Sequence, residues 1–347
     1  MNPYVDPKYL TPLAPRAAWD GWFAIAMFPA GSPLRWLKAH AYRRDDEPGR
    51  FPFSLVEGMG EQTEVMIAWA NADEVEVKVS VVEPEPLTAA ASPLRVALGE
   101  SFLLEGKAPD YRMTFTLPAN RGCASFNFRA GWPVWWAKFG PMLQYVGQHS
   151  GVSVDFPSRS VSGNGSETLA LDGFGVMEHV AGASASFDFT GTPLHFHWDV
   201  LAFDDAQSPF DSAAGLSIGM GGRTIVPLKA AARFPGSEAR GMRGLWVKYR
   251  EVTTGVDEAG NAIMVPVRWE GLMRSSQGTF RYEATAATPV AGIVPGGGML
   301  GFDFEGRWTT RGSNRTTLRG YGFNEYGDFS GALEQLARRE SGGASGE

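Results

Sequence analysis

Apolar and polar residues alternate along much of this chain, in short runs that turn residues separate. Glu74–Val82 reads EVEVKVSVV and Ala124–Arg129 reads ASFNFR. A strand buried on one face has this two-residue period because successive side chains point to opposite faces. Such runs recur at roughly 8–12-residue intervals in the second half of the chain, as is typical of an all-β barrel or sandwich.

The alternation predicts strands in both halves of the chain. In the first half they are Trp19–Phe28, Phe51–Leu55, Thr63–Ala70, Glu74–Val82, Leu94–Leu104, Tyr111–Leu117, Ala124–Arg129 and Val152–Phe156. In the second half they are Ser184–Phe189, Leu194–Phe203, Leu216–Met220, Thr224–Leu228, Gly244–Arg250, Ala262–Trp269, Thr279–Ala284 and Gly301–Trp308.

Three segments depart from this pattern. Ala39–Arg50 is polar and charged and predicts a loop. Gly131–Gly140, GWPVWWAKFG, has a spacing that permits one or two helical turns. Gly331–Glu340, GALEQLARRE, places apolar residues at i, i+3 and i+4 and predicts a short C-terminal helix. Residues 341–347 are expected to form a disordered tail.

A motif occurs twice, once in each half. Gly-aromatic-Gly-x-x-Glu is found at Gly173–Glu178 and again at Gly320–Glu325. We interpret this as a duplicated fold. Residues 1–185 are expected to form one barrel with a proline-rich arm, and residues 186–340 a second barrel with the terminal helix.

Composition narrows the class of protein. The formal net charge of −7 argues against a broad nucleic-acid surface, because phosphate binding needs clustered Lys and Arg. The single cysteine, Cys123, excludes an internal disulfide and fits a reducing compartment. No secretory signal is visible and no apolar run approaches the length of a membrane helix. We therefore expect a cytoplasmic protein without stable membrane insertion.

The adjacent pair Glu178 and His179 is the leading candidate for chemistry. Neighbours on a strand point to opposite faces, so only one of the two can face a given cavity. If His179 faces a barrel interior, its imidazole can accept or donate a proton near neutral pH. Glu178 would then face the second domain. Alternatively, because Glu325 repeats it, Glu178 is an architectural hydrogen-bond acceptor.

A second group of polar residues follows on one strand. His195, His197 and Asp199 lie two residues apart and therefore share a face. They permit a metal site, but no cysteine or second histidine cluster completes it, so no metal is expected. The simpler interpretation places His197 and Asp199 toward a cavity and Trp198 on the other face. Asp204 and Asp205 come next, either as turn formers or as acids with a raised pKa.

Aromatic residues predict an apolar pocket. Trp132, Trp135 and Trp136 crowd together and are expected to cap it. Phe174, His197, Trp198 and Tyr321 complete the expected substrate-binding set. Such a pocket suits a polyene, terpenoid or polyketide, and aromatic faces can stabilise developing positive charge.

Gly173–Gly182 resembles the G-x-G-[FY]-x-[DE]-H-x-W-G stretch of the AttH/carotenoid 1,2-hydratase family. The aromatic strand that follows resembles that family's W-x-W strand. Ala181 and Phe196 stand where the family has tryptophan. The resemblance implies two tandem lipocalin-like barrels, a layout similar to that of lipocalin-like Diels–Alderases. It also implies hydration, cyclisation or cycloaddition of hydrophobic substrates without a cofactor.

The sequence thus predicts a cofactor-independent enzyme acting on an apolar small molecule. His179 and Glu178 are the expected acid and base, with Asp205 or Asp199 as proton donor. The alternative from another class is a lipid or pigment carrier without catalysis. A third option is a metal-dependent enzyme that uses His195 and His197.

Overall fold

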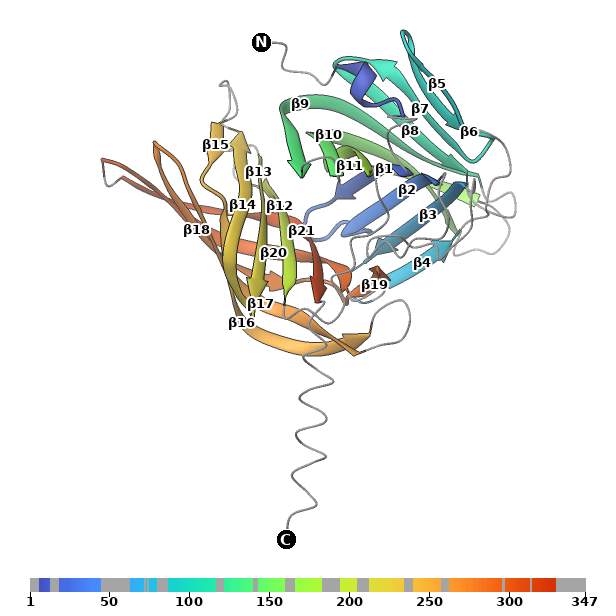
Figure 1. Cartoon of the computed structure of the whole chain (residues 1–347). Coiled ribbons are helices and arrows are strands. Elements are labelled where there is room, and N and C mark those ends of the chain that lie inside the picture. Colours follow the sequence, from blue (N-terminus) through green and yellow to red (C-terminus); the bar gives the residue numbers. More distant parts are fainter. Residues whose placement is uncertain are drawn as a thin grey trace, which may run out of the picture.

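A computed structural model shows an almost entirely β protein made of two antiparallel sheets (Figure 1). The structure describes residues 6–12, 19–44, 63–71, 73, 75–79, 87–116, 122–139, 143–159, 166–182, 194–204, 212–233, 240–256, 262–294, 297–312 and 314–328.

The first sheet is built from the N-terminal half. A 3-10 turn, η1 (Pro7–Tyr9), precedes it. Its strands are β1 (Trp19–Met27), β2 (Trp36–Arg44), β3 (Thr63–Ala70), β4 (Val75–Val79), β5 (Leu87–Ala91), β6 (Leu94–Leu98), β7 (Phe102–Lys107), β8 (Asp110–Thr116), β9 (Cys123–Phe139), β10 (Leu143–Arg159) and β11 (Ser166–Gly182).

The second sheet is built from the C-terminal half. Its strands are β12 (His195–Phe203), β13 (Ser212–Met220), β14 (Arg223–Arg233), β15 (Arg240–Met242), β16 (Leu245–Val256), β17 (Ala262–Arg274), β18 (Gly278–Ala286), β19 (Ala291–Val294), β20 (Gly297–Thr310) and β21 (Arg315–Asp328).

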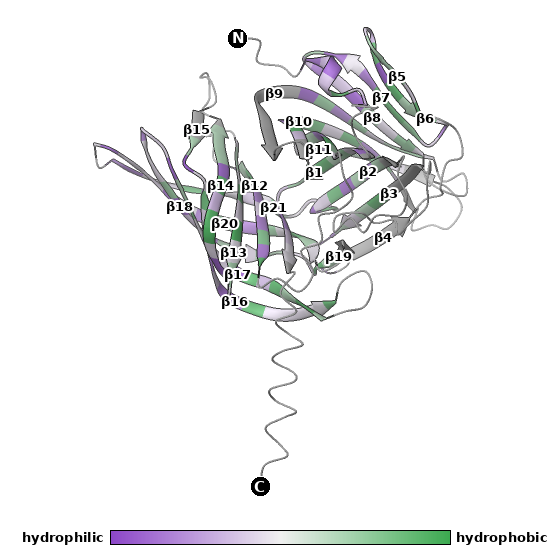
Figure 2. Cartoon of the chain, viewed as in Figure 1, coloured by the Kyte–Doolittle hydropathy of each residue, from purple (hydrophilic) through white to green (hydrophobic). Residues whose placement is uncertain are grey.

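The N-terminal sheet curls around one apolar core. Its strand order is β4-β3-β2-β1-β11-β10-β9-β8-β7-β6-β5. Strands far apart in this order meet inside it. The rings of Trp22 on β1 and Phe102 on β7 lie 6.0 Å apart, and those of Trp69 on β3 and Phe156 on β10 lie 4.8 Å apart. Hydrophobic and hydrophilic residues alternate along many of these strands (Figure 2), as a sheet with one buried face requires.

The C-terminal sheet closes on itself. Its order is β13-β12-β21-β20-β18-β17-β16-β14-β15, and β13 also pairs with β14. A second core, which includes Trp269, Phe280, Tyr282 and Phe302, fills this barrel. The expected all-β fold, with one sheet built from each half of the chain, is confirmed.

A third apolar cluster joins the two halves. Ile25 on β1 and Val176 on β11 pack with Val200 on β12 and Phe323 on β21. The strand registers are equivalent, because Phe23 pairs with Glu178 as Trp198 pairs with Glu325. The repeated motif therefore occupies the same position in each half, on strands that pack against the other half.

Three local predictions were wrong. The single strand expected at Leu94–Leu104 is two antiparallel strands, β6 and β7, because the chain turns at Gly99, which has a positive φ. The loop expected at Ala39–Arg50 is strand as far as Arg44, because the small Ala39 and Ala41 face the core while polar Lys38 and His40 are buried on the other face. That strand therefore lacks the usual hydrophobic signature. The helical turns expected after Gly131 are instead strand, since β9 continues to Phe139.

Several other predictions fall outside the described residues. These are the boundary between the halves near residue 185, the strands Phe51–Leu55 and Ser184–Phe189, the C-terminal helix and the tail. Within the described part of the chain, no helix has the length and apolar character needed to span a membrane.

Candidate functional site

Glu178 and His179 point to opposite faces of β11, as the strand period predicts. His179 points into the N-terminal core, where its ring stacks on Trp22 with centroids 4.9 Å apart. Glu178 lies between the two halves of the molecule, near Glu325 and Lys38. The two neighbours therefore belong to separate environments.

His179 holds the N-terminal segment in place. Its Nδ1 lies 2.7 Å from the carbonyl oxygen of Tyr9, and its Nε2 lies 3.0 Å from Oδ1 of Asp20. Because a carbonyl can only accept, Nδ1 carries a hydrogen. The indole of Trp22 also donates to the carbonyl oxygen of Leu10, at 2.8 Å. Both ring nitrogens of His179 are thus occupied by the protein itself.

The surroundings of Glu178 strongly raise the pKa of its carboxyl group. The Tyr145 hydroxyl donates a hydrogen bond to its Oε1. Burial raises the pKa of Glu178 to about 8, and the nearby Glu325 adds to the rise, whereas the Tyr145 hydrogen bond and Lys38 oppose it. At neutral pH the side chain is consequently a neutral carboxylic acid, with Oε2 as the oxygen that can carry the proton. Burial and the Glu178 carboxyl also raise the pKa of Tyr145 well above its ordinary value.

Glu325, the counterpart of Glu178, has a different partner. Lys38 Nζ lies 3.1 Å from its Oε2, forming an ion pair across the two halves. The same ammonium lies over the ring of Phe23, at 5.3 Å from its centroid. We refer to Lys38, Tyr145, Glu178 and Glu325 as the inter-barrel cluster. It contains a neutral acid, a phenol and a neutralised charge pair within largely apolar surroundings.

A separate polar network fills part of the C-terminal barrel. Asp199 is fully buried, and its Oδ2 accepts hydrogen bonds from Trp269 Nε1 at 2.9 Å and the Tyr282 hydroxyl at 2.5 Å. Its Oδ1 accepts from Asn324 at 2.8 Å and lies 2.9 Å from Nε2 of His197. Burial, followed by the Asp199 charge, raises the pKa of Tyr282 well above its ordinary value. Asp199 is therefore held as an acceptor.

His197 links this carboxylate to a third residue. Its Nδ1 lies 3.1 Å from the hydroxyl of Tyr249, and the ring of His195 lies 5.2 Å from that of Tyr249. Trp198 points the other way, into the cluster between the halves, as the sequence predicts. Among the described residues, no three His, Cys, Asp or Glu side chains are grouped to hold a metal ion.

The remaining predicted residues divide into two groups. Phe174 and Tyr321 lie at the apolar cluster between the halves. Burial, with the Asp204 charge, raises the pKa of Tyr321 to about 12, and burial raises that of Asp204. Asp205 lies outside the described residues, as do the side chains of Trp132, Trp135 and Trp136.

Sequence reasoning missed Lys38, Tyr145, Asp20 and Asn324. The run WLKAHAYRR at Trp36–Arg44 does alternate, with lysine and histidine on one face and alanines on the other. Given the tryptophan at its start, this alternation could have predicted a strand with a polar, buried face. The structure does not bring His179 and Asp199 together, because they point into the interiors of different halves.

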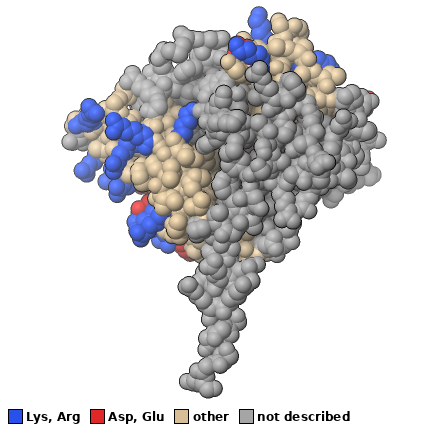
Figure 3. All heavy atoms as spheres, viewed as in Figure 1, with Lys and Arg blue, Asp and Glu red and all other residues tan. Residues whose placement is uncertain are grey.

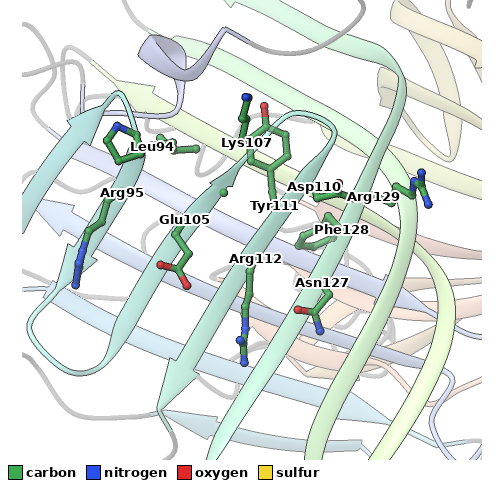
Figure 4. A pocket seen from close by; sticks show the side chains of 12 residues that line it. Leu94, Arg95, Glu105, Lys107, Asp110, Tyr111, Arg112, Asn127, Phe128 and Arg129 are labelled. Atoms are coloured by element: carbon green, nitrogen blue, oxygen red, sulfur yellow. The ribbon is translucent and has the colours of Figure 1, made fainter.

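A surface hollow of about 680 Å³ lies elsewhere, against β6 to β9 (Figure 4). Arg95, Glu105, Arg112 and Asn127 are cross-strand neighbours along its wall. These side chains are largely exposed, and none of the predicted site residues lines the hollow.

Comparisons with known proteins address the fold. No protein-family model matches the sequence, and no curated protein matches it significantly. The crystal structure of a "putative AttH" from Nitrosomonas europaea has a TM-score of 0.57 and 12% identity, covering 90% of this chain and 93% of that one. CghA in complex with Sch210972 has a TM-score of 0.55 and 14% identity, covering 90% of this chain and 89% of CghA. The chain therefore has the tandem lipocalin-like fold that AttH-type proteins and CghA share.

Proposed function

We propose that this protein is a cofactor-independent enzyme that acts on an apolar small molecule at the inter-barrel cluster, with Glu178 as the acid. The observation that carries the proposal is a buried carboxyl whose pKa is raised to about 8. An acid with a strongly raised pKa beside a specific partner is typical of functional sites, because a general acid must still carry its proton at neutral pH.

The chemistry follows from the two oxygens of Glu178. Tyr145 donates to Oε1, so Oε2 can give its proton to a substrate alkene or carbonyl. In a hydration, the proton bonds to one alkene carbon and water attacks the resulting cation. The added water then returns a proton to the Glu178 carboxylate, which restores the enzyme. Aromatic faces such as that of Phe23 can stabilise the cation.

Isomerisation and cyclisation use the same first step. In isomerisation, the cation loses a neighbouring proton to the Glu178 carboxylate. In cyclisation, a second alkene of the substrate attacks the cation, and the new cation formed by ring closure then loses a proton to the Glu178 carboxylate, which restores the enzyme. For a cycloaddition, the neutral acid would act by hydrogen bonding to a carbonyl while the site holds the substrate in a reactive conformation. CghA, which has this fold, has been crystallised with the small molecule Sch210972, and this supports a small-molecule ligand.

Glu178→Gln tests this proposal. The amide keeps the size of the side chain but has no acidic proton, so we expect turnover to fall by roughly 10²–10⁴-fold. Native mass spectrometry of protein purified from a lipid-rich host, before and after organic extraction, reveals what each form carries. Glu105→Gln, an exposed change of the same chemistry, is the matched control.

The outcomes separate the two function classes. A bound apolar molecule that differs chemically between wild type and Glu178→Gln supports an enzyme. The same molecule on both proteins, bound equally well, supports the carrier. Absence of any extractable molecule from both would contradict an apolar ligand.

A further inference from the structure

Six exposed arginines gather at one end of the C-terminal barrel, where the β17–β18 and β20–β21 hairpins turn (Figures 1 and 3). They are Arg243, Arg274, Arg281, Arg307, Arg311 and Arg315. Backbone hydrogen bonds tie their segments together, from Arg243 N to the Arg274 carbonyl at 2.6 Å and from Arg311 N to the Gln277 carbonyl at 3.1 Å. We call this group the arginine end.

The strand registers show how the charges are arranged. Arg281 and Arg307 are direct cross-strand partners. Two residues nearer the hairpin turns, a second cross-strand row runs Arg274, Thr279, Thr309, Arg315, so that an arginine stands at each end of it. None of the six guanidinium groups forms an ion pair within the described part of the chain. Like charges directly opposite one another destabilise a sheet, so an anionic partner would relieve this repulsion.

Apolar side chains stand exposed beside these arginines. Trp246 is 42% exposed and shares a row with them, pairing with Leu272, which in turn pairs with Arg281. Ile225 and Val226 on β14 are 48% and 46% exposed. They lie close to Trp246, because the residues on either side of them contact the residues around it: Thr224 accepts a hydrogen bond from Val247 N, and Pro227 packs on Gly244.

Carboxylates lie just behind this surface. Glu270, Glu283 and Glu305 form a cross-strand row two residues farther along each strand, roughly 7 Å away at the rise of a β-strand. Arg250 and Arg319 pair with the outer members of that row. A flat anionic surface would touch the arginines and stay clear of the carboxylates. A nucleic acid following the sheet would meet both.

We propose that the arginine end docks on the surface of a bilayer that contains anionic lipids. The guanidinium groups would bind lipid phosphates in bidentate fashion, and Trp246, Ile225 and Val226 would enter the interface between headgroups and acyl chains. Docking would bring the protein to where apolar molecules dissolve. It does not rest on the proposed function and can fail or succeed independently of Glu178.

Vesicle flotation with the full chain tests this proposal. We expect binding to vesicles of equimolar phosphatidylcholine and phosphatidylglycerol, little binding to phosphatidylcholine alone, and weaker binding as salt is raised. The double variant Arg281→Gln/Arg307→Gln should bind about 25-fold more weakly, at about fivefold for each arginine near an anionic surface. Trp246→Ala should also weaken binding.

Arg95→Gln/Arg129→Gln is the matched control, because it removes two exposed arginines from the N-terminal half. Equal loss in this control, equal binding to neutral vesicles, or no vesicle binding by the wild type would overturn the proposal. Binding of an oligonucleotide that depends on Arg281 and Arg307, without vesicle binding, would assign the surface to nucleic acid instead. Circular dichroism of each variant confirms that it is folded. The salt dependence of vesicle binding is measured on the wild type, so that part of the test does not depend on any variant folding correctly.

Discussion

Two glutamates at equivalent positions have different neighbours in this protein. Glu325 is ion-paired with Lys38, whereas Glu178 is buried beside a tyrosine and has a pKa raised to about 8. The repeated motif indicates that these residues are related but not which of them is unusual. The difference comes from neighbours on other strands, whose positions become known only once the sheets are paired and packed.

The pKa of Glu178 has a consequence for stability. Because it is higher in the folded state than its ordinary value of 4.5, the folded protein keeps this proton between roughly pH 4.5 and 8 while the unfolded chain loses it. The contribution of Glu178 to stability is thus fully present below that window and falls as the pH rises through it.

We therefore expect Glu178→Gln to become more stable relative to wild type as the pH is raised from 5 to 8, since the amide cannot ionise. Thermal unfolding of both proteins across this range measures the difference. Glu105→Gln should show no such trend. A parallel pH dependence of Glu178→Gln and wild type would show that Glu178 is not protonated in the folded state.

The Asp199 network predicts strong coupling between residues. Asp199→Asn places an amide group near the donors of Trp269 and Tyr282 and should cost about 1–3 kcal/mol for each donor left unpaired. Tyr282→Phe removes one of these donors, so the double variant should lose less stability than the sum of the two single changes. Urea unfolding of the three variants measures this coupling, and strict additivity would contradict the network.

At the scale of elements, the N-terminal turn depends on its contacts with β1 and β11. η1 spans three residues, too few for stability on its own. Its attachment comes from His179 to the Tyr9 carbonyl and from Trp22 to the Leu10 carbonyl, with Leu10 buried in the core.

His179→Ala should therefore release this segment without unfolding the sheet. Loss of one hydrogen bond of about 1 kcal/mol predicts roughly fivefold faster amide exchange around residues 7–11. Hydrogen exchange measured by mass spectrometry checks this. Exchange in β16 to β18 should not change. Unaltered exchange at the segment would show that His179 does not hold it.

Most strands could be predicted from the sequence, because alternation is a direct consequence of one-sided burial. Thr63–Ala70 is confirmed at both ends. The failures have a common cause. β2 alternates, but between alanines and polar residues that are themselves buried, so it lacks the apolar–polar contrast of a half-buried strand, and the second part of β9 is crowded with tryptophan. Whether a polar residue is buried depends on packing between sheets, which no local pattern contains.

At the scale of the whole molecule, the two halves share an apolar cluster, and Arg35 also pairs with Asp303 across the junction. Halves that share a core of this kind should unfold together. Val200 is fully buried within the shared cluster. Val200→Asp would place a charge there and should separate one calorimetric transition into two.

Val252→Asp provides the control for this change. Val252 is 47% exposed on the C-terminal half, so the same substitution there should leave a single transition. A single transition for Val200→Asp as well would indicate that the halves are not held together through this cluster.

The equivalent registers of the two halves have one more consequence. Ile25 and Val200 pair with Val176 and Phe323, so the same surface of each half is buried against the other, as in a symmetric homodimer. Lys38, on β2, is the cross-strand partner of Ile25. The cross-strand partner of Val200, the equivalent residue of the second half, is Ala214. In a symmetric homodimer, the two equivalent glutamates would have identical surroundings, so that either both or neither would pair with a lysine. Covalent fusion of the halves removes that constraint, so one glutamate can be neutralised while the other is left to retain its proton.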